Sequence, residues 1–283
     1  MRLLVTGSAG MLGRAVAEAA ARRGHEVVAL RRAELDVTDA AAVERALAAA
    51  APRAVVNCAG FTDVDGAEAD EAAALRVNGA GAGHVARAAA QASARVVHVS
   101  TDYVFDGTKR EPWTESDPVG PLQAYGRTKL AGERAVAAAN PDHAIVRAGW
   151  LFGAGGRNFA DTMLGLLAER DEVEVVADQV GHPTWTGHLA PALIELAERD
   201  GDAGIFHATG PDHCSWYELA AEIAHAAGRP ARVVPTTTER FARPAPRPAY
   251  SVLATERAPG VVLPAWAEGL AAYLAVRTSR VPA

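Results

Sequence analysis

Short apolar runs alternate with alanine-rich helical segments through the first 150 residues of the chain. The runs are RLLV (2–5), HEVVAL (25–30), RAVVNCAG (53–60), ARVVHVSTDYVF (94–105) and HAIVRAGWLFG (143–153). Runs of this length and apolar content are typical of strands, and the segments between them have helical spacing. Because strands that alternate with helices form βαβ units, the pattern predicts an α/β fold with a doubly wound parallel sheet.

Beyond about residue 150 the alternation becomes less regular. Strand-like and helical segments still follow one another, but a Pro- and Arg-rich stretch at 235–250 interrupts them and is typical of a loop. We therefore expect a smaller, discontinuous C-terminal lobe beside the sheet domain. The expected division assigns residues 1–150 plus about 186–210 to the sheet domain, and about 151–185 plus 211–283 to the lobe.

Composition and charge exclude several classes of protein. A chain of 283 residues with 49% hydrophobic content can bury a large core. Its net charge of -6 offers no basic surface, so we expect no nucleic-acid partner. Cys58 and Cys214 lie far apart without metal-ligand spacing, which predicts neither a disulfide nor a metal site. Without a signal peptide or a membrane-length apolar segment, a cytoplasmic protein with no membrane partner is expected.

A glycine-rich motif, GSAGMLG, directly follows the first expected strand and opens the first helix. It places Gly7, Gly10 and Gly13 in a GxxGxxG spacing, with Met11 and Leu12 between the last two glycines. Small residues allow a tight turn, close approach of backbone N–H groups to a pyrophosphate, and close helix packing. A glycine-rich turn without a ligand is the alternative. The strand and helix around the motif favour a Rossmann-type site for a dinucleotide.

The residues that end the second expected strand bear on which dinucleotide binds. An acidic residue there would bind the ribose hydroxyls of NAD, whereas a cation would accept the 2′-phosphate of NADP. Arg31 and Arg32 occupy this place, so NADPH is the expected cofactor, with NADH as the alternative if both arginines are simply solvated. Further cofactor contacts are expected from residues that follow the second and third strands, namely Asp36, Val37, Ala59 and Gly60.

A tyrosine and a lysine stand four residues apart in the segment YGRTK. Only two of the chain's 28 basic residues are lysines, and Lys129 is one of them. On a helix, Tyr125 and Lys129 would share one face. A nearby ammonium can stabilise a tyrosine phenolate and can bind a nicotinamide ribose, which a planar guanidinium would do with different geometry. The spacing favours a catalytic pair over a pair of surface residues.

Together with Asn78 and Ser100-Thr101, these features resemble the extended short-chain dehydrogenase/reductase superfamily, in which Asn78 would lie at the cofactor. Within it, the chain is similar over nearly its whole length to the dTDP-4-dehydrorhamnose reductase family. The motifs that carry this resemblance are FTDVDGAEAD (61–70), VNGAG (77–81), STDYVFDG (100–107), YGRTKLAGE (125–133), RAGWLFG (147–153), DQVGHPT (178–184), SWYELA (215–220) and RPAYSVL (247–253).

The resemblance implies a role for each matching residue in the reduction of a dTDP-4-keto-6-deoxysugar. Tyr125 would donate a proton to the C4 carbonyl oxygen as hydride arrives from NADPH, Thr101 would hydrogen-bond that oxygen, and Lys129 would hold the cofactor ribose. The C-terminal lobe would bind the nucleotide sugar. The implied sugar contacts are Val64, Asp102, Tyr103 and Trp150, and the candidates for the nucleotide-diphosphate end are Asn158 and Arg247.

Several alternatives stay open at this point. The family more often has a smaller polar residue in place of Tyr250, which leaves the particular sugar open. A 4,6-dehydratase is disfavoured because an acidic pair would follow its threonine, whereas Asp102 and Tyr103 follow Thr101 here. A reductase of another dTDP-4-keto-6-deoxysugar and a non-catalytic NADP-binding regulatory partner remain as rivals. A homodimer is compatible with the sequence.

Overall fold

A computed structural model describes residues 1–278 and has a seven-stranded parallel sheet at its centre. The strand order is β13-β10-β5-β4-β3-β1-β2. From β1 the order runs to β2 in one direction and through β3, β4 and β5 in the other, which is the topology of a doubly wound sheet. The predicted fold class is therefore confirmed. The strands are β1 (Arg2–Thr6), β2 (Glu26–Leu30), β3 (Ala54–Asn57), β4 (Arg95–Thr101), β5 (His143–Ala148), β10 (Gly204–Thr209) and β13 (Val261–Val262).

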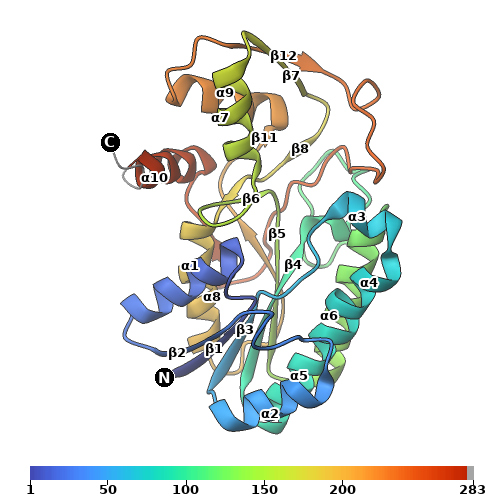
Figure 1. Cartoon of the computed structure of the whole chain (residues 1–283). Helices are drawn as coiled ribbons and strands as arrows, with labels where there is room; N and C mark the ends of the chain where they lie inside the picture. The colour runs from blue at the N-terminus through green and yellow to red at the C-terminus, as the bar shows by residue number, and fades with distance from the viewer. Residues whose placement is uncertain (279–283) are drawn as a thin grey trace.

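Helices cover both faces of this sheet (Figure 1). The first strand shows why: Leu3 and Val5 pack into one apolar core and Leu4 packs into the other. Successive side chains of a strand point to opposite faces, so a run buried on both faces is apolar throughout. The helices on the first face are α1 (Met11–Arg22) and α8 (Thr186–Glu198), and those on the second are α2 (Ala40–Ala50), α5 (Ala82–Gln91) and α6 (Ala124–Ala139).

The helical segment expected around residues 70–92 is divided into short pieces. The structure has α3 (Val64–Ala69), α4 (Glu71–Leu75), the π-helical turn η1 (Arg76–Gly81) and then α5. Asp63 and Asp70 cap the first two pieces, since their carboxylates accept from the N–H groups of Gly66 and Ala73. The caps at Asp63 and Asp70 thus begin two separate short helices in place of one long one.

A smaller lobe lies beyond the carboxyl ends of the central strands, at the top of Figure 1. Its core packs helices α7 (Phe159–Glu169), α9 (Trp216–Ala226) and α10 (Trp266–Thr278) against strand β7 (Glu172–Val176), which pairs in parallel with β12 (Arg232–Thr236). The remaining elements are β6 (Leu151–Phe152), β8 (Val180–Gly181), β9 (Thr184–Trp185), β11 (Cys214–Ser215) and the 3-10 turn η2 (Asp102–Val104).

Strand β13 belongs to the central sheet, because Ala208 and Thr209 of β10 pair in parallel with Val261 and Val262. The sequence analysis placed these residues in the smaller lobe, since a two-residue edge strand leaves no periodic signal. The division into two lobes otherwise stays a prediction, and residues 279–283 of the expected lobe lie outside the described residues. No helix among residues 1–278 is both long and apolar enough to cross a membrane.

Candidate active site

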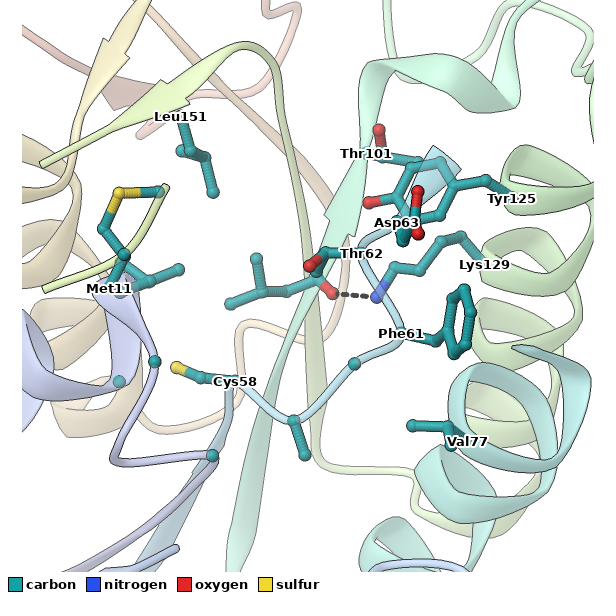
Figure 2. Close-up of a pocket in the computed structure, with 18 of the residues that line it drawn as sticks. Met11, Cys58, Phe61, Thr62, Asp63, Val77, Thr101, Tyr125, Lys129 and Leu151 are labelled. Carbon is teal, nitrogen blue, oxygen red and sulfur yellow. Dashed lines mark hydrogen bonds between the residues drawn. The ribbon is translucent and has the colours of Figure 1, made fainter. Parts of the chain in front are cut away.

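A cavity of about 870 Å³ lies between the carboxyl ends of the central strands and the smaller lobe. In doubly wound folds this is the place where ligands bind. Figure 2 shows Met11 and Leu151 on one side of the cavity and Thr101, Tyr125 and Lys129 on the other.

The glycine-rich motif forms the first part of the cavity wall. Gly7 has a φ of +64°, which favours glycine, and a Cβ on Gly13 would lie 2.3 Å from the carbonyl oxygen of Gly7. The turn is therefore too tight for any side chain at Gly13. Gly10 is the N-cap of α1 and provides no side-chain cap, no acidic residue follows in the first turn, and residues 10–13 line the cavity. A pyrophosphate fits this cradle.

The two arginines at the end of β2 have different surroundings. Arg31 is ion-paired with Glu34, with Nη2 and Oε1 3.0 Å apart, and does not line the cavity. Arg32 lines the cavity, as do Asp36 and Val37. The carboxylate of Asp36 accepts hydrogen bonds from the N–H and the hydroxyl of Thr38, which lower its pKa. Of the two arginines, only Arg32 lines the cavity, and its role in cofactor binding stays a prediction.

A buried hydrogen-bond network, which the sequence analysis missed, connects the ends of β1, β3 and β4. The hydroxyl of Thr6 donates to Asn57 Oδ1 at 2.6 Å, and Asn57 Nδ2 lies 3.1 Å from His98 Nδ1. Burial and the nearby Lys129 lower the pKa of His98 well below its usual value, so the imidazole is neutral. The network fixes the chain that enters Ala59 and Gly60, both of which line the cavity.

Thr101, Tyr125 and Lys129 come together on the opposite wall. Thr101 ends β4, and the other two lie one turn apart near the start of α6. Lys129 is 5% exposed and its Nζ donates to the carbonyl oxygen of Val99 at 2.6 Å, as Figure 2 shows. The hydroxyl of Thr101 donates to Asp102 Oδ1 at 3.1 Å and interacts with the Tyr125 hydroxyl strongly enough to affect its pKa. The predicted catalytic residues therefore form one cluster at the cavity.

The ionisation of this cluster differs from one expectation. We expected Lys129 to stabilise the Tyr125 phenolate, which would lower the tyrosine pKa. Instead, burial raises the pKa of Tyr125 to about 12, although the hydrogen bond with Thr101 opposes this shift. Burial also lowers the pKa of Lys129 to about 8, opposed by the charge of Glu133. The tyrosine is thus protonated at neutral pH, the form that a proton donor needs.

Asp102 and Tyr103 continue the catalytic wall beyond Thr101. Burial raises the pKa of Asp102 to about 6, although hydrogen bonds with Ser251 and Thr101 oppose the shift. The ring of Tyr103 meets that of Tyr125 edge-on, with centroids 6.2 Å apart. Both residues line the cavity, and their contact with the sugar stays a prediction.

A buried ion pair supports the catalytic wall from behind and was also missed by the sequence analysis. Arg147 on β5 donates to both carboxylate oxygens of Glu133 at 2.9 and 2.7 Å, and the side chains are 2% and 4% exposed. Ser100, which precedes Thr101, donates to Glu133 Oε1 at 2.5 Å. Glu133 lies one turn after Lys129 on α6. An acid at this spacing within YGRTKLAGE is the signal that could have indicated it.

The expected sugar contacts Val64 and Trp150 also line the cavity. Trp150 has a φ of 49°, an uncommon backbone conformation for a bulky residue. Its ring stacks on that of Trp216, with centroids 3.5 Å apart. Trp216 also lines the cavity, and the sequence analysis did not identify it as a site residue. A Cβ on Gly181 would lie 2.6 Å from the Trp150 ring. Trp150 is therefore packed closely against both Trp216 and Gly181.

Three other expected contacts do not line the cavity. Asn78 lies on η1 and bonds both the N–H and the carbonyl oxygen of Phe61, so it positions a neighbouring residue. Asn158 caps α7, since its side chain accepts from the N–H of Asp161. Arg247 is ion-paired with Asp65 at 2.9 Å. Their assignment to ligands stays a prediction.

No group of three or more His, Cys, Asp or Glu side chains within residues 1–278 is placed to hold a metal ion. Cys58 lines the cavity, and burial raises the pKa of its thiol to about 12. The thiol is therefore protonated and a poor nucleophile at neutral pH.

Comparisons with known proteins agree with this geometry. The family model "RmlD substrate binding domain" matches residues 1–279. The chain is 49% identical over 262 residues to a dTDP-4-dehydrorhamnose reductase of Streptomyces griseus, covering 90% of this chain and 86% of that protein. It is 48% identical over 260 residues to a probable dTDP-4,6-dihydroxy-2-methyloxan-3-one 4-ketoreductase of Streptomyces antibioticus, covering 91% and 88%.

Solved structures show the same relationship. A dTDP-4-dehydrorhamnose reductase of Clostridium acetobutylicum superposes with a TM-score of 0.95 at 42% identity, covering 98% of this chain and 100% of that one. The enzyme of Bacillus anthracis in complex with NADP superposes with a TM-score of 0.94 at 34% identity, covering 97% and 99%. With the family model matched along residues 1–279 and the Thr101, Tyr125 and Lys129 cluster in place, the chain belongs to the dTDP-4-dehydrorhamnose reductase family.

Proposed function

We propose that the protein reduces the C4 ketone of dTDP-4-dehydro-L-rhamnose with NADPH and forms dTDP-L-rhamnose. The observation that carries this proposal is the cluster of Thr101, Tyr125 and Lys129 facing the glycine-rich motif across one cavity. A carbonyl placed between these walls meets hydroxyl donors on one side and the dinucleotide site on the other. Membership of the family supports the same reaction.

The bound cofactor supplies hydride to C4, and the chain supplies the proton and the geometry. Tyr125 donates its phenolic proton to the ketone oxygen, and its raised pKa keeps that proton in place until the oxygen gains negative charge. Thr101, whose hydroxyl donates to Asp102 Oδ1 in this structure, would turn that hydroxyl to the same ketone oxygen when the sugar is bound. The reduction balances as one hydride added to carbon and one proton added to oxygen.

Lys129 has the second positioning role. Its Nζ lies against the carbonyl oxygen of Val99 at the end of β4, one helical turn from Tyr125. From this position the ammonium can donate to the hydroxyls of the nicotinamide ribose and stabilise the tyrosinate that forms after proton transfer. Burial of the side chain excludes water that would otherwise compete for these hydrogen bonds.

The cofactor preference follows from the surroundings of the cavity. Gly7 and Gly13 form a tight turn that any side chain at Gly13 would block, and Arg32, which lines the cavity, would accept the 2′-phosphate. The complex of the Bacillus anthracis enzyme with NADP supports NADPH over NADH. We assign Gly7, Gly10, Gly13 and Arg32 to cofactor binding.

A reductase of another dTDP-4-keto-6-deoxysugar is the second candidate. The observation that favours it is the presence, among relatives of similar identity, of a dTDP-4-keto-6-deoxy-D-glucose reductase from Streptomyces niveus at 46%. Both candidates need the same proton donor and cofactor. They differ in the sugar, which Val64, Trp150 and Trp216 would contact at the cavity.

The test is NADPH oxidation by purified protein given freshly generated dTDP-4-dehydro-L-rhamnose, with the product identified by NMR. We expect turnover and dTDP-L-rhamnose. Turnover with dTDP-4-keto-6-deoxy-D-glucose and none with dTDP-4-dehydro-L-rhamnose would establish the second candidate. Binding of NADPH without oxidation by either sugar would favour a non-catalytic regulatory role.

A further inference from the structure

Two arginines line the cavity, Arg32 and Arg157. Both are exposed, and within residues 1–278 neither forms a salt bridge, although the chain has more acidic than basic residues. Arg32 follows β2, whereas Arg157 lies in the loop between β6 and α7 on the lobe side of the cavity. NADPH carries two anionic groups, a 2′-phosphate and a diphosphate. The second cavity arginine has no role in the reaction as proposed above.

The loop that carries Arg157 lies directly on the start of α1. A Cβ built on Gly156 would be 3.2 Å from the Met11 Cβ and 3.8 Å from the Met11 backbone nitrogen. Gly155 has a φ of +89° and lies against Arg14, whose Nε would be 2.9 Å from a Cβ at that position. Glycines at both positions therefore let the loop approach the helix more closely than side chains would allow.

The approach is held by the residue that follows Arg157. Asn158 donates through Nδ2 to the carbonyl oxygens of Gly153 at 3.0 Å and Gly156 at 3.2 Å. The same side chain caps α7, the first helix of the smaller lobe. Asn158 thus fixes the loop geometry and connects it to the lobe, which gives this residue a positioning role.

We propose that Arg157 binds the diphosphate of the dinucleotide from the lobe side, opposite the N–H groups that begin α1. This inference rests on the proposed function, because it assumes that the cavity takes NADPH. The proximity of Gly156 to the Met11 nitrogen favours the cofactor diphosphate over that of the nucleotide sugar. A guanidinium suits this role, since its fork of donors matches phosphate oxygens. Arg14, exposed and next to Gly155, adds a second positive charge.

The assignment has a structural consequence. The glycine-rich motif and Arg32 belong to the sheet domain. Arg157 belongs to the loop that leads into α7, on the lobe side of the cavity. Cofactor binding would then connect the two sides of the cavity before the sugar arrives. Loss of Arg157 should weaken every dinucleotide that has a diphosphate, whatever stands at its 2′ position.

The test measures the dissociation constants of NADPH and NADH by nucleotide fluorescence, in the wild-type protein and in four variants. Arg157→Ala should weaken both nucleotides by a similar factor, about tenfold each. Arg32→Ala should weaken NADPH more than NADH. Arg134→Ala is the matched control, because Arg134 is an exposed arginine of α6 away from the cavity and forms no salt bridge within the described residues. Arg157→Lys should restore part of the affinity.

Two outcomes would overturn the inference. Equal affinity of wild type and Arg157→Ala for both nucleotides would remove Arg157 from the site. Weaker binding of dTDP with unchanged NADPH and NADH would assign Arg157 to the sugar nucleotide instead. Failure of the wild-type protein to bind NADPH would contradict the proposed function itself, so the two failures are distinguishable.

Discussion

The two walls of the cavity are built in opposite ways. The catalytic wall, formed by Thr101, Tyr125 and Lys129, consists of side chains on a central strand and a helix, with Thr101 and Lys129 each 5% exposed. The cofactor wall, formed by the motif from Gly7 to Gly13 with Arg32 and the loop 155–157, consists of backbone N–H groups and exposed guanidinium groups.

The difference reflects what each wall has to do. Proton transfer requires groups held in place with shifted pKa values, and burial against a rigid sheet provides both. Recognition of phosphates requires close approach of the backbone and solvated positive charge, which glycines and exposed arginines provide. The catalytic wall should therefore respond strongly to single substitutions, and the cofactor wall more weakly.

The largest expected effect is on the catalytic wall itself. Tyr125→Phe removes the proton donor but keeps the ring that packs against Tyr103, so turnover should fall roughly 10²- to 10⁴-fold. NADPH affinity should stay within about twofold, because the lost hydroxyl serves the ketone. Steady-state kinetics and a fluorescence titration check the two quantities. Unchanged turnover would remove Tyr125 as proton donor.

The support behind the catalytic wall should be nearly as sensitive. Arg147→Met leaves the Glu133 carboxylate buried without its bidentate partner, which should lower the free energy of unfolding by roughly 3 to 5 kcal/mol. The matched control is the double variant Arg147→Met/Glu133→Leu, which removes both charges and should lose less. Urea unfolding measures both variants. A double variant less stable than Arg147→Met would show that the pair itself, and not the orphaned charge, stabilises the fold.

Lys129 should separate stability from activity on the same wall. Its pKa is about 8 in the folded protein and 10.5 ordinarily, so between these values the unfolded chain binds more protons and stability rises with pH. Lys129→Met removes this buried charge and should therefore raise the free energy of unfolding at pH 7 by an amount on the order of 1 to 3 kcal/mol. The same substitution should abolish turnover, because the ammonium that holds the cofactor ribose is lost.

The pH dependence gives the control for this variant. Its advantage over wild type should shrink as pH rises from about 8 to 10.5, because the wild-type lysine then loses its charge in both states. Urea unfolding at several pH values tests this. A variant less stable than wild type at pH 7 would show that contacts with Val99 and Glu133 outweigh the cost of burying the charge.

The smallest expected effects lie on the cofactor wall. Arg32→Ala should reduce the preference for NADPH over NADH about tenfold, because a charged hydrogen bond to the 2′-phosphate is lost. Arg31→Ala should change it little, because Arg31 is exposed and paired with Glu34 outside the cavity. The ratio of kcat/KM values for the two cofactors measures the preference. Equal effects of both substitutions would contradict the assignment to Arg32.

The same contrast explains which parts of the site could be predicted from the sequence. Gly7, Gly10 and Gly13 stand close together in the chain, and so do Tyr125 and Lys129, so their spacing alone indicated a turn and a shared helical face. Asn57 and His98 are 41 positions apart, and Glu133 meets Arg147 from a different element. No local pattern shows that such residues meet, and both networks were missed.

Expected ligand contacts failed to reach the cavity for a related reason. Asn158 and Arg247 are polar residues in recognisable motifs, but hydrogen bonds to Gly153 and an ion pair with Asp65 occupy their side chains. Arg31 and Arg32 are neighbours in the sequence. At the end of a strand, successive side chains point to opposite faces, so only one of the two can face the cavity. A sequence motif specifies which residue types are present, but it does not specify which other side chains or ligands they contact.

The sequence by itself determined the doubly wound sheet, the glycine cradle and the Tyr125 and Lys129 pair, because each depends on periodicity or spacing within one or two elements. The tertiary structure alone decided which arginine lines the cavity, how burial shifts the pKa values of Tyr125 and Lys129, and that the loop carrying Arg157 lies against the start of α1. These properties depend on desolvation and on contacts between segments distant in the chain, which exist only once the sheet has brought its strand ends together.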